Sequence, residues 1–381
     1  MDINDFRNSI NGIDDEIISL FKKRMAISLK IAEYKKQNNL PILDKARERE
    51  LLKSVAEKSG DELSLYATML YSTMFSVSRS YQQKCLNEKS SLLDNVKMSI
   101  ANSRDKCFPE NAVVACQGVE GAYSSLAAEK LFKRPDIMFF KTFDDVFSAV
   151  DKGLCKYGML PIENSTAGSV NRVYDLMSEH HFYIVRSQRL KIEHSLLSKN
   201  NTSLKEIKEI YSHEQAINQC SEFLKTIANV KINIVENTAV AAKIVMESDR
   251  NDIAAISSND CAELYNLNII LKSIQNNDNN YTRFICISKD LEIYSGAEKT
   301  SLMMTLPHRA GSLYDVMSKF YALSINLQKI ESRPIPGTDF EFMFYFDVDI
   351  SVNSAEFPLF IEEVGAMGNS TIYLGSYNEI I

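Results

Sequence analysis

Hydrophobic residues recur at helical spacing along the first forty positions of the chain. The apolar positions, separated by four and three residues in alternation with one interruption, are Phe6, Ile10, Ile13, Ile17, Leu20, Ile27, Ile31 and Tyr34. This period predicts one helix over residues 5–36, roughly 48 Å long at 1.5 Å per residue. Because a compact domain of three helices cannot cover so long an apolar face, we expect a second subunit to cover it in an intertwined dimer.

Arg24 interrupts this apolar series. A single arginine at such a position usually extends its charged end into solvent, and that interpretation stays open. Lys35 lies eleven residues further on, which places it only ~20° from Arg24 around the helix. Two cations on one buried stripe repel each other unless an anion lies between them, so the pair indicates an anion site. Arg7 points roughly 100° away from Arg24, which suits the pocket of a neighbouring subunit.

Two shorter helices are predicted to complete the first ninety residues. The first begins after Asp44, whose side chain is of the type that caps helices, and the second covers residues 61–86. The polar residues that these helices add to the buried side are Asp44, Arg47, Glu48, Ser78 and Gln82. Ser78 and Gln82 are four residues apart, and such a pair is more often a contact within one helix than part of a site. With the cations of the long helix, however, these residues describe a pocket for a small dianion.

This segment resembles the all-helical chorismate mutase family in FRNSINGID, KKRMA, DKARERE and SVSRSYQQ, which occur in the family's order. The resemblance implies that chorismate's two carboxylates are bound by Arg24, Arg47 and Arg7 of the partner subunit. It implies that the ether oxygen is contacted by Lys35 and Gln82, and that the pocket is completed by Asp44, Glu48 and Ser78. The rearrangement of chorismate to prephenate is pericyclic, so the protein restrains the substrate and stabilises charge instead of supplying a nucleophile.

From residue 112 the pattern changes to short apolar runs alternating with helical stretches. The predicted strands are 112–116, 157–162, 182–186, 209–212, 231–235, 253–256 and 281–287. Polar residues follow several of them, and α/β folds place ligands at such strand ends. A glycine turn at 118–121, before a predicted helix, offers backbone N–H groups to an anion, although such turns are more often simple punctuation. There is no GxGxxG motif, so no dinucleotide site is predicted.

Three motifs in this region, PIENSTAGSV (161–170), YSH (211–213) and TRF (282–284), resemble those of prephenate dehydratase. The resemblance spans 112–288 and implies two α/β lobes separated by a cleft, as in periplasmic binding proteins. The catalytic residues that it implies are Glu163, Asn164, Ser212, Gln219 and Thr282. Arg283 either binds a substrate carboxylate or forms a structural ion pair. Val119 and Ala122 stand where many relatives have proline and a hydroxyl residue.

The dehydration itself sets a requirement for the site. Prephenate loses CO2 only if its ring hydroxyl departs, and hydroxide leaves poorly without a proton donor or strong hydrogen bond. Thr282 is the residue that the resemblance places there. Since a threonine hydroxyl is a weak acid in water, we expect neighbouring groups to polarise it.

The last eighty residues predict strand 301–306, helix 311–323, strands 325–332 and 340–350, helix 354–367 and strand 371–376. This βαββαβ order indicates a small ferredoxin-like sandwich. The segments GSLY (311–314) and ESRP (331–334) resemble the ACT regulatory domain, with Ser312 where that family more often has alanine. The resemblance implies that L-phenylalanine binds at an interface between two such domains through Gly311, Leu313, Glu331 and Ser332. A domain that serves only dimerisation is the alternative.

The composition of the chain argues against several classes of protein and of binding site. Acidic residues outnumber basic ones by 50 to 43, so no general attraction to nucleic acid is expected. The polar N-terminus and the lack of a long apolar run predict neither a signal peptide nor a membrane span, and we expect a cytoplasmic protein. The seven cysteines and five histidines show no ligand spacing, so we expect no metal and no cofactor.

Together these patterns predict a multidomain protein. The expected parts are a helical mutase domain (1–88), a linker (89–109), a dehydratase domain (110–290) and an ACT domain (298–381). This order resembles the bifunctional chorismate mutase/prephenate dehydratases of phenylalanine biosynthesis, which convert chorismate through prephenate to phenylpyruvate under feedback inhibition by L-phenylalanine. We expect a homodimer or a higher homo-oligomer. The alternatives are a non-catalytic amino-acid sensor, a mutase joined to a prephenate dehydrogenase, and a degenerate enzyme with one activity.

Overall fold

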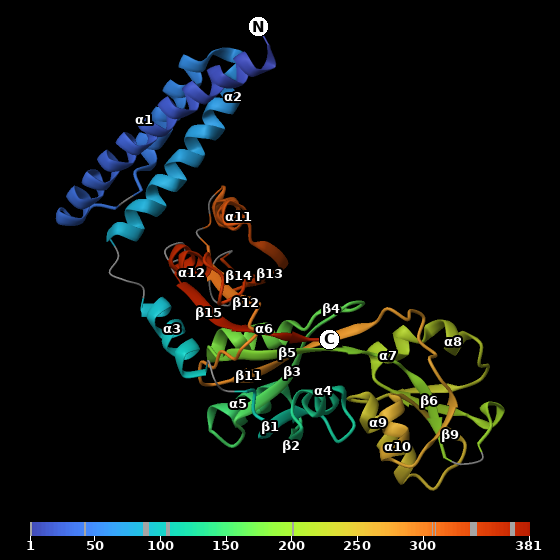
Figure 1. Cartoon of the computed structure of the whole chain (residues 1–381). Coiled ribbons are helices and arrows are strands. Elements are labelled where there is room, and N and C mark those ends of the chain that lie inside the picture. Colours follow the sequence, from blue (N-terminus) through green and yellow to red (C-terminus); the bar gives the residue numbers. More distant parts are fainter. Residues whose placement is uncertain are drawn as a thin grey trace. The chain divides into compact units, whose positions relative to one another are not determined.

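The chain forms two compact units in a computed structural model, shown in Figure 1. The structure describes residues 2–41, 43–86, 91–103, 107–199, 202–306, 308, 310–335, 341–365 and 370–381. The first unit comprises Met1–Asn95, Thr305–Ile325 and Ala355–Thr371, and the second Val96–Met304, Asn326–Ser354 and Ile372–Ile381. None of the helices in the described part of the chain combines the length and the apolar character needed to cross a membrane.

Helices α1 (Ile3–Gln37) and α2 (Lys45–Leu86) make up most of the first unit. Gly60 interrupts α2 with a φ of 71°, a conformation that glycine adopts without a steric penalty. The segments before and after this kink are the second and third predicted helices. Asp44 caps the first of them, because the Arg47 backbone N–H donates to its Oδ1 at 3.0 Å. The prediction of three helices is therefore confirmed.

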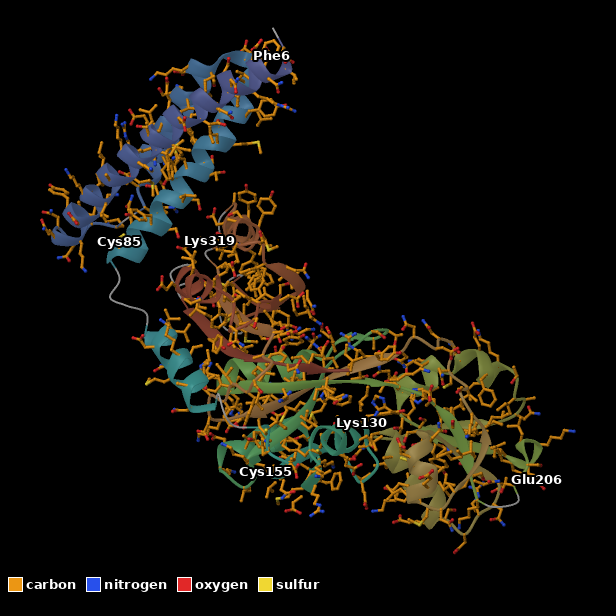
Figure 2. The ribbon with its side chains drawn as sticks, viewed as in Figure 1. Phe6, Cys85, Lys130, Cys155, Glu206 and Lys319 are labelled. Carbon is orange, nitrogen blue, oxygen red and sulfur yellow. The ribbon has the colours of Figure 1, made fainter. Side chains whose placement is uncertain are left out.

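The predicted apolar stripe of α1 faces outward in the single chain. Residues of α1 buried against α2 are Met25, Ser28 and Ala32, which lie beside that stripe. Phe6, labelled in Figure 2, is 51% exposed, and Tyr34 is 62% exposed. The single chain therefore leaves uncovered most of the surface that the sequence marks as apolar.

Two further helices, α11 (Ser312–Ala322) and α12 (Phe357–Gly365), belong to the first unit. The rings of Phe320 and Phe360 lie 5.9 Å apart and join the two helices. Both helices occur where the sequence predicts them.

The second unit contains two α/β lobes, as predicted. The sheet of the first lobe has the order β16-β5-β11-β3-β1-β2, with β4 paired to β3. Its strands are β1 (Asn111–Gln117), β2 (Arg134–Phe140), β3 (Tyr157–Asn164), β4 (Gly168–Ser169), β5 (Tyr183–Lys191), β11 (Tyr281–Ser288) and β16 (Glu379–Ile380). Its helices are α4 (Tyr123–Leu131), α5 (Phe143–Asp151) and α6 (Asn171–His180). Strand β11 runs antiparallel between β3 and β5, so the chain returns to this sheet after building the second lobe.

The sheet of the second lobe has the order β10-β6-β9-β7-β8. Its strands are β6 (Ser195–Ser198), β7 (Glu209–Ser212), β8 (Lys231–Ile234), β9 (Ile253–Ser257) and β10 (Asn268–Leu271). The helical segments of this lobe are η1 (Leu204–Glu206), α7 (Glu214–Gln219), α8 (Ser221–Lys225), α9 (Thr238–Glu247) and α10 (Asn259–Leu264). The sequence predicts β7, β8 and β9 but not β6 or β10.

The third sheet has the order β13-β14-β12-β15. Its strands are β12 (Lys299–Thr305), β13 (Asn326–Pro334), β14 (Phe342–Asp349) and β15 (Ser370–Tyr377). With α11 and α12 in chain order, they give the predicted βαββαβ succession. The predicted linker contains helix α3 (Ser91–Ser103), while residues 89, 90 and 104–106 of it lie outside the described residues.

Candidate active sites

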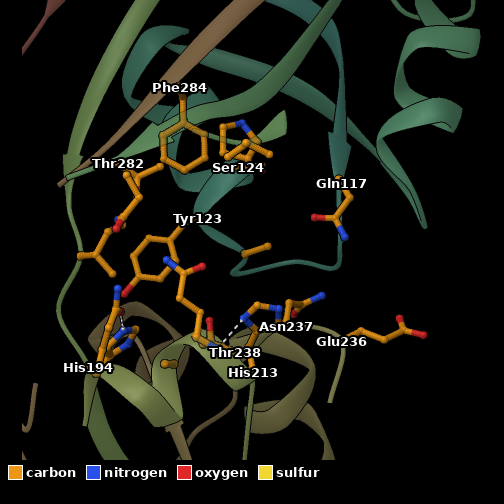
Figure 3. Close-up of a pocket in the computed structure, with 18 of the residues that line it drawn as sticks. Gln117, Tyr123, Ser124, His194, His213, Glu236, Asn237, Thr238, Thr282 and Phe284 are labelled. Atoms are coloured by element: carbon orange, nitrogen blue, oxygen red, sulfur yellow. Dashed lines mark hydrogen bonds between the residues drawn. The ribbon is translucent and has the colours of Figure 1, made fainter. Parts of the chain in front are cut away.

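A cavity of about 420 Å³ lies in the second unit, lined by residues of both lobes. This volume is in the range of sites for small organic ligands. The first lobe contributes Gln117, Tyr123, Ser124, Asn164, Thr282 and Phe284, and the second His213, Gln219, Asn237 and Thr238. Figure 3 shows Thr282 and Phe284 on one side of this space and His213 and Thr238 on the other.

Thr282 and Asn164 meet across two neighbouring strands at the edge of the cavity. They are register partners of β11 and β3, and the Asn164 Nδ2 donates to Thr282 Oγ1 at 2.8 Å. The threonine oxygen therefore accepts a hydrogen bond while its own hydrogen stays available to another acceptor. Since an accepted hydrogen bond strengthens a hydroxyl as a donor, this contact supplies the polarisation that a weakly acidic threonine hydroxyl requires.

The orientation of the Asn164 amide is fixed by its other contacts. Its Oδ1 accepts hydrogen bonds from the backbone N–H groups of Thr166, at 3.0 Å, and Ala167, at 2.9 Å. A backbone N–H can only donate, so this end of the amide must be the oxygen. The Nδ2 group is then left to donate to Thr282 and to Asn280.

Gln219 and His194 extend this polar network. The Gln219 Nε2 donates to Thr166 Oγ1 at 2.9 Å, and its Oε1 accepts from Asn280 Nδ2 at 3.1 Å. The same Oε1 lies 2.9 Å from His194 Nε2, which is therefore the donor. Burial lowers the pKa of His194, against an opposing effect of the Gln219 bond, so the ring is neutral. Its Nδ1 then carries a lone pair, and this buried atom has no hydrogen-bond partner.

Two helices begin at the cavity wall. Tyr123 and Ser124 form the first turn of α4, and Asn237 caps α9 by accepting from the Val240 N–H at 2.8 Å. First-turn N–H groups have no partner within their helix and favour anions. The predicted glycine turn leads into α4, and Gly121 has a φ of 84°. A Cβ atom there would lie 2.9 Å from Cys261 Sγ, so the turn requires glycine.

Three predicted dehydratase residues do not line the cavity. Ser212 is fully buried and donates to the Ile256 carbonyl oxygen at 2.7 Å. Glu163 and Arg283 alternate with Asn164 and Thr282 along their strands and therefore point to the opposite face of the sheet.

Arg283 takes the structural role of the two that the sequence left open. Its Nη2 bonds Asp347 of β14, and its Nε lies 3.1 Å from Glu163 Oε1, without hydrogen-bond geometry. Burial lowers the pKa of Arg283, but Asp347 and the other groups around it, among them Glu163, together raise it by more, so its pKa lies well above the ordinary value. In this arrangement Arg283 is not placed to bind a substrate carboxylate.

The first unit brings together part of the predicted mutase residues. The Arg24 guanidinium carbon lies 5.5 Å from the centre of the Phe75 ring, and its Nη1 is buried without a hydrogen-bond partner. Lys35, which the sequence places on the same stripe, is half-buried. A buried, unpaired guanidinium nitrogen is costly unless an anion neutralises it.

Polar residues of α2 lie on the same side of the helix pair. Ser78 and Gln82 are buried; the Gln82 Nε2 donates to Ser78 Oγ at 3.2 Å, and Ser78 donates to Ser28 Oγ at 2.9 Å. Glu48 accepts from Arg79, a residue that is not among the predicted site residues.

Other predicted mutase residues lie apart from these contacts. Arg7 is exposed, and Asp44 serves as a helix cap. The side chain of Arg47 is 59% exposed and forms an ion pair with Glu50 at 2.6 Å. In the single chain, therefore, the expected carboxylate-binding arginines do not converge.

The residues predicted to bind the effector belong to both units. Gly311 adopts a φ of 87° at the start of α11, where Leu313 is 37% exposed. Glu331 faces the first lobe and accepts from Ser169 Oγ, whereas Ser332 lies on the exposed face of β13.

Two family models match separate parts of the chain. The family described as "Chorismate mutase type II" matches residues 6–83, and "Prephenate dehydratase" matches residues 114–292. A bifunctional chorismate mutase/prephenate dehydratase of Enterobacter agglomerans is 31% identical over 379 residues, covering 97% of this chain and 94% of that protein.

Two solved structures share the fold of the larger part of the chain. Prephenate dehydratase from Arthrobacter aurescens in complex with L-Phe is 26% identical with a TM-score of 0.62, covering 70% of this chain and 90% of that one. GqqA, described as a novel type of quorum-quenching acylase, is 27% identical with a TM-score of 0.63, covering 70% and 97%. Because these two names differ on one fold, the fold alone does not define the reaction.

Proposed function

The chain belongs to the bifunctional chorismate mutase/prephenate dehydratase family. On this basis we propose which residues carry out each of the two reactions. The enzyme has both activities of the family, and these support phenylalanine biosynthesis. We assign the mutase to residues 1–88, the dehydratase to 110–290 and an ACT domain to 298–381. L-phenylalanine inhibits the enzyme through the last of these.

The dehydratase reaction occurs in the cavity beside Thr282. The bond between the ring and its carboxylate breaks, CO2 departs, and the electron pair enters the ring as the bond to the hydroxyl oxygen breaks. The hydroxide takes up a proton and leaves as water. Thr282 donates its hydrogen to the departing oxygen, and Asn164 stabilises the negative charge that this donation places on the threonine oxygen. The Asn164–Thr282 hydrogen bond at 2.8 Å is the observation that carries this proposal.

The walls of the cavity suit the rest of the substrate. The first turns of α4 and α9 present backbone N–H groups to the two carboxylates of prephenate. Gln219 holds the loop of Thr166 in place from the second lobe. Phe284 and Ile192 provide apolar surface for the ring as it becomes aromatic.

The mutase reaction occurs on the face of α1 that carries Arg24 and Lys35. The unpaired Arg24 Nη1 binds a carboxylate of chorismate, while Lys35 and Gln82 stabilise the charge that grows on the ether oxygen. Arg7 of the partner subunit completes the pocket. The exposed apolar stripe of α1 supports this assignment, since an intertwined homodimer buries it.

Phenylalanine binding is the third element of the proposal. The βαββαβ order of the last eighty residues and the glycine turn at Gly311 support an ACT domain. The relative from Arthrobacter aurescens was solved with L-Phe bound. The residues expected to contribute are Gly311, Leu313 and Ser332, whereas the side chain of Glu331 faces the first lobe and accepts from Ser169.

One experiment tests both reactions together. Purified enzyme receives chorismate, and the loss of chorismate and the formation of phenylpyruvate are followed with and without L-phenylalanine. Chorismate should disappear, phenylpyruvate should accumulate, and L-phenylalanine should slow the second process. Persistence of chorismate would contradict the mutase assignment, and accumulation of unchanged prephenate would contradict the dehydratase assignment.

A further inference from the structure

Strands β3 and β11 carry two neighbouring pairs of residues whose side chains point to opposite faces of the sheet. Asn164 and Thr282 are register partners at the cavity, and Glu163 and Arg283 are the next partners along the same strands. Successive side chains of a strand point to opposite faces. The catalytic pair therefore has a charged pair directly behind it, one peptide unit away on each strand.

The charged pair is bound by strands of the third sheet. Arg283 bonds Asp347 of β14, whose other oxygen accepts from Ser301 of β12. Glu163 bonds Lys329 of β13, and Lys329 also donates to Ser169 Oγ at 3.0 Å. The side chains of Arg283 and Asp347 are only 5% and 1% exposed. Charges this deeply buried stay in place only while each keeps its partner.

Strand β13 presents a different set of side chains on each of its faces. Lys329, Glu331 and Arg333 alternate along it and bind Glu163, Ser169 and Asp175 of the dehydratase lobe. Arg333 is bidentate to Asp175, at 3.0 and 3.1 Å. On the other face, Ile330 is 42% exposed and Ser332 is also exposed. One strand thus holds the back of the catalytic strands and offers a free face to a ligand.

We propose that Lys329 and Arg283 are positioning residues for the dehydratase, and that β13 transmits effector binding to Thr282 through the Lys329–Glu163 and Asp347–Arg283 pairs. A ligand on the free face of β13 that shifts this strand by a fraction of an ångström moves Glu163 and Arg283, and with them Asn164 and Thr282. The inference rests on the proposed function, because it needs a dehydratase at Thr282 and an effector at the third sheet. It assigns Glu163 a role behind the site instead of contact with the substrate.

The test compares Lys329→Met with two matched variants of the full-length enzyme. Lys329→Arg keeps the charge, and Lys156→Met removes a lysine that pairs with Asp290 and Glu292 just before the other end of β3. We expect Lys329→Met to lower the dehydratase kcat by roughly ten- to a hundredfold, with KM within about twofold, because the substrate is still bound but the hydroxyl of Thr282 is misplaced. Inhibition by L-phenylalanine should be lost. Lys329→Arg should retain both the dehydratase kcat and the inhibition by L-phenylalanine, and Lys156→Met should resemble the wild type.

A double-mutant cycle adds a readout that a merely structural role does not move. Glu163→Gln combined with Lys329→Met should be no worse than the poorer single variant, because both break one unit. Additive losses would mean that Glu163 acts on the substrate independently and would overturn the proposal. A wild-type kcat or an unchanged response to L-phenylalanine in Lys329→Met would also overturn it. Failure of the proposed function is distinguishable, because the wild-type enzyme itself would then form no phenylpyruvate from prephenate.

Discussion

The two candidate sites differ in how much of each a single chain provides. In the dehydratase cavity, Asn164, Thr166 and Gln219 satisfy one another's hydrogen bonds around Thr282. In the helical unit, Arg24 has a buried nitrogen without a partner, Arg7 is exposed, and the apolar stripe of α1 is uncovered. The groups that hold Thr282 are paired within one chain and are therefore preorganised, although His194 Nδ1 at the cavity wall is buried without a partner. A site with unpaired buried charge and uncovered apolar surface lacks something, which we propose to be a second chain and a substrate.

The largest expected effect falls on the self-contained site. Thr282→Ala removes the donor to the departing hydroxyl, so the dehydratase kcat should fall roughly 10²- to 10⁴-fold. Chorismate consumption should continue at the wild-type rate. Thr282→Ser, which keeps the hydroxyl, is the control and should retain much of the activity. Both are measured by steady-state kinetics with each substrate. Equal loss of both activities in a folded variant would contradict two separate sites.

The reciprocal change at the helical site should be nearly as large. Lys35→Ala removes a cation from the face where negative charge develops on the ether oxygen, and mutase kcat should fall roughly 10²- to 10³-fold. Prephenate turnover should not change, because Lys35 belongs to the first unit and the cavity to the second. Lys30→Ala, an exposed lysine of the same helix, is the matched control. Unchanged mutase activity in Lys35→Ala would mean that the reaction takes place at another site.

A smaller effect tests whether the turn before α4 helps to hold the cavity together. Gly121→Ala forces a side chain into a φ of 84° and toward Cys261 Sγ, so it should destabilise the second unit by roughly 1–3 kcal/mol. Gly153→Ala meets open space at a φ of 71° and should cost only about 1 kcal/mol. Thermal unfolding of the two variants gives the difference. Equal transition temperatures would show that the turn at Gly121 accommodates the added Cβ atom without a steric penalty.

The smallest expected effect is a pH dependence of stability. Burial lowers the pKa of His194 in the folded protein, whereas the unfolded chain titrates near the usual value of about 6.5. Below that value the unfolded state binds more protons, so stability is lost as pH falls toward the folded pKa. His194→Gln should flatten this slope, as measured by urea unfolding between pH 5 and 8. His213, whose pKa burial also lowers, remains in both proteins. An unchanged slope would mean that the pKa of His194 is the same in the folded and the unfolded protein.

The sequence predicts the elements that carry strong periodicity. Helix α1, the kinked α2 and strands β7 and β9 lie within a few residues of their predicted bounds. The sequence does not predict strand β2, because the strand begins with Arg134 and Pro135 and its burial pattern alternates only weakly. Strand β6 is only four residues long, with serine at both ends.

Motifs identified the dehydratase region but not the direction of each side chain. Glu163 and Asn164 are adjacent in one motif, and Arg283 follows Thr282 in another, yet only one residue of each couple lines the cavity. The period of two along a strand contains this information and would have separated them. The partners Lys329 and Asp347 are distant in sequence, so no local pattern predicts those pairs. His194 and Asn280 belong to no motif and are found only through their contacts with Gln219.

The contrast between the two sites is tested most directly by mixing inactive subunits. Arg7→Ala and Lys35→Ala proteins are unfolded together, refolded as a mixture and assayed for mutase. If each pocket takes Arg7 from the partner subunit, hybrid dimers hold one intact pocket, and about a quarter of the wild-type mutase activity should return. A parallel mixture of Asn164→Ala and Thr282→Ala should regain no dehydratase activity, because both residues belong to one cavity. No recovery of mutase would contradict a pocket shared between subunits.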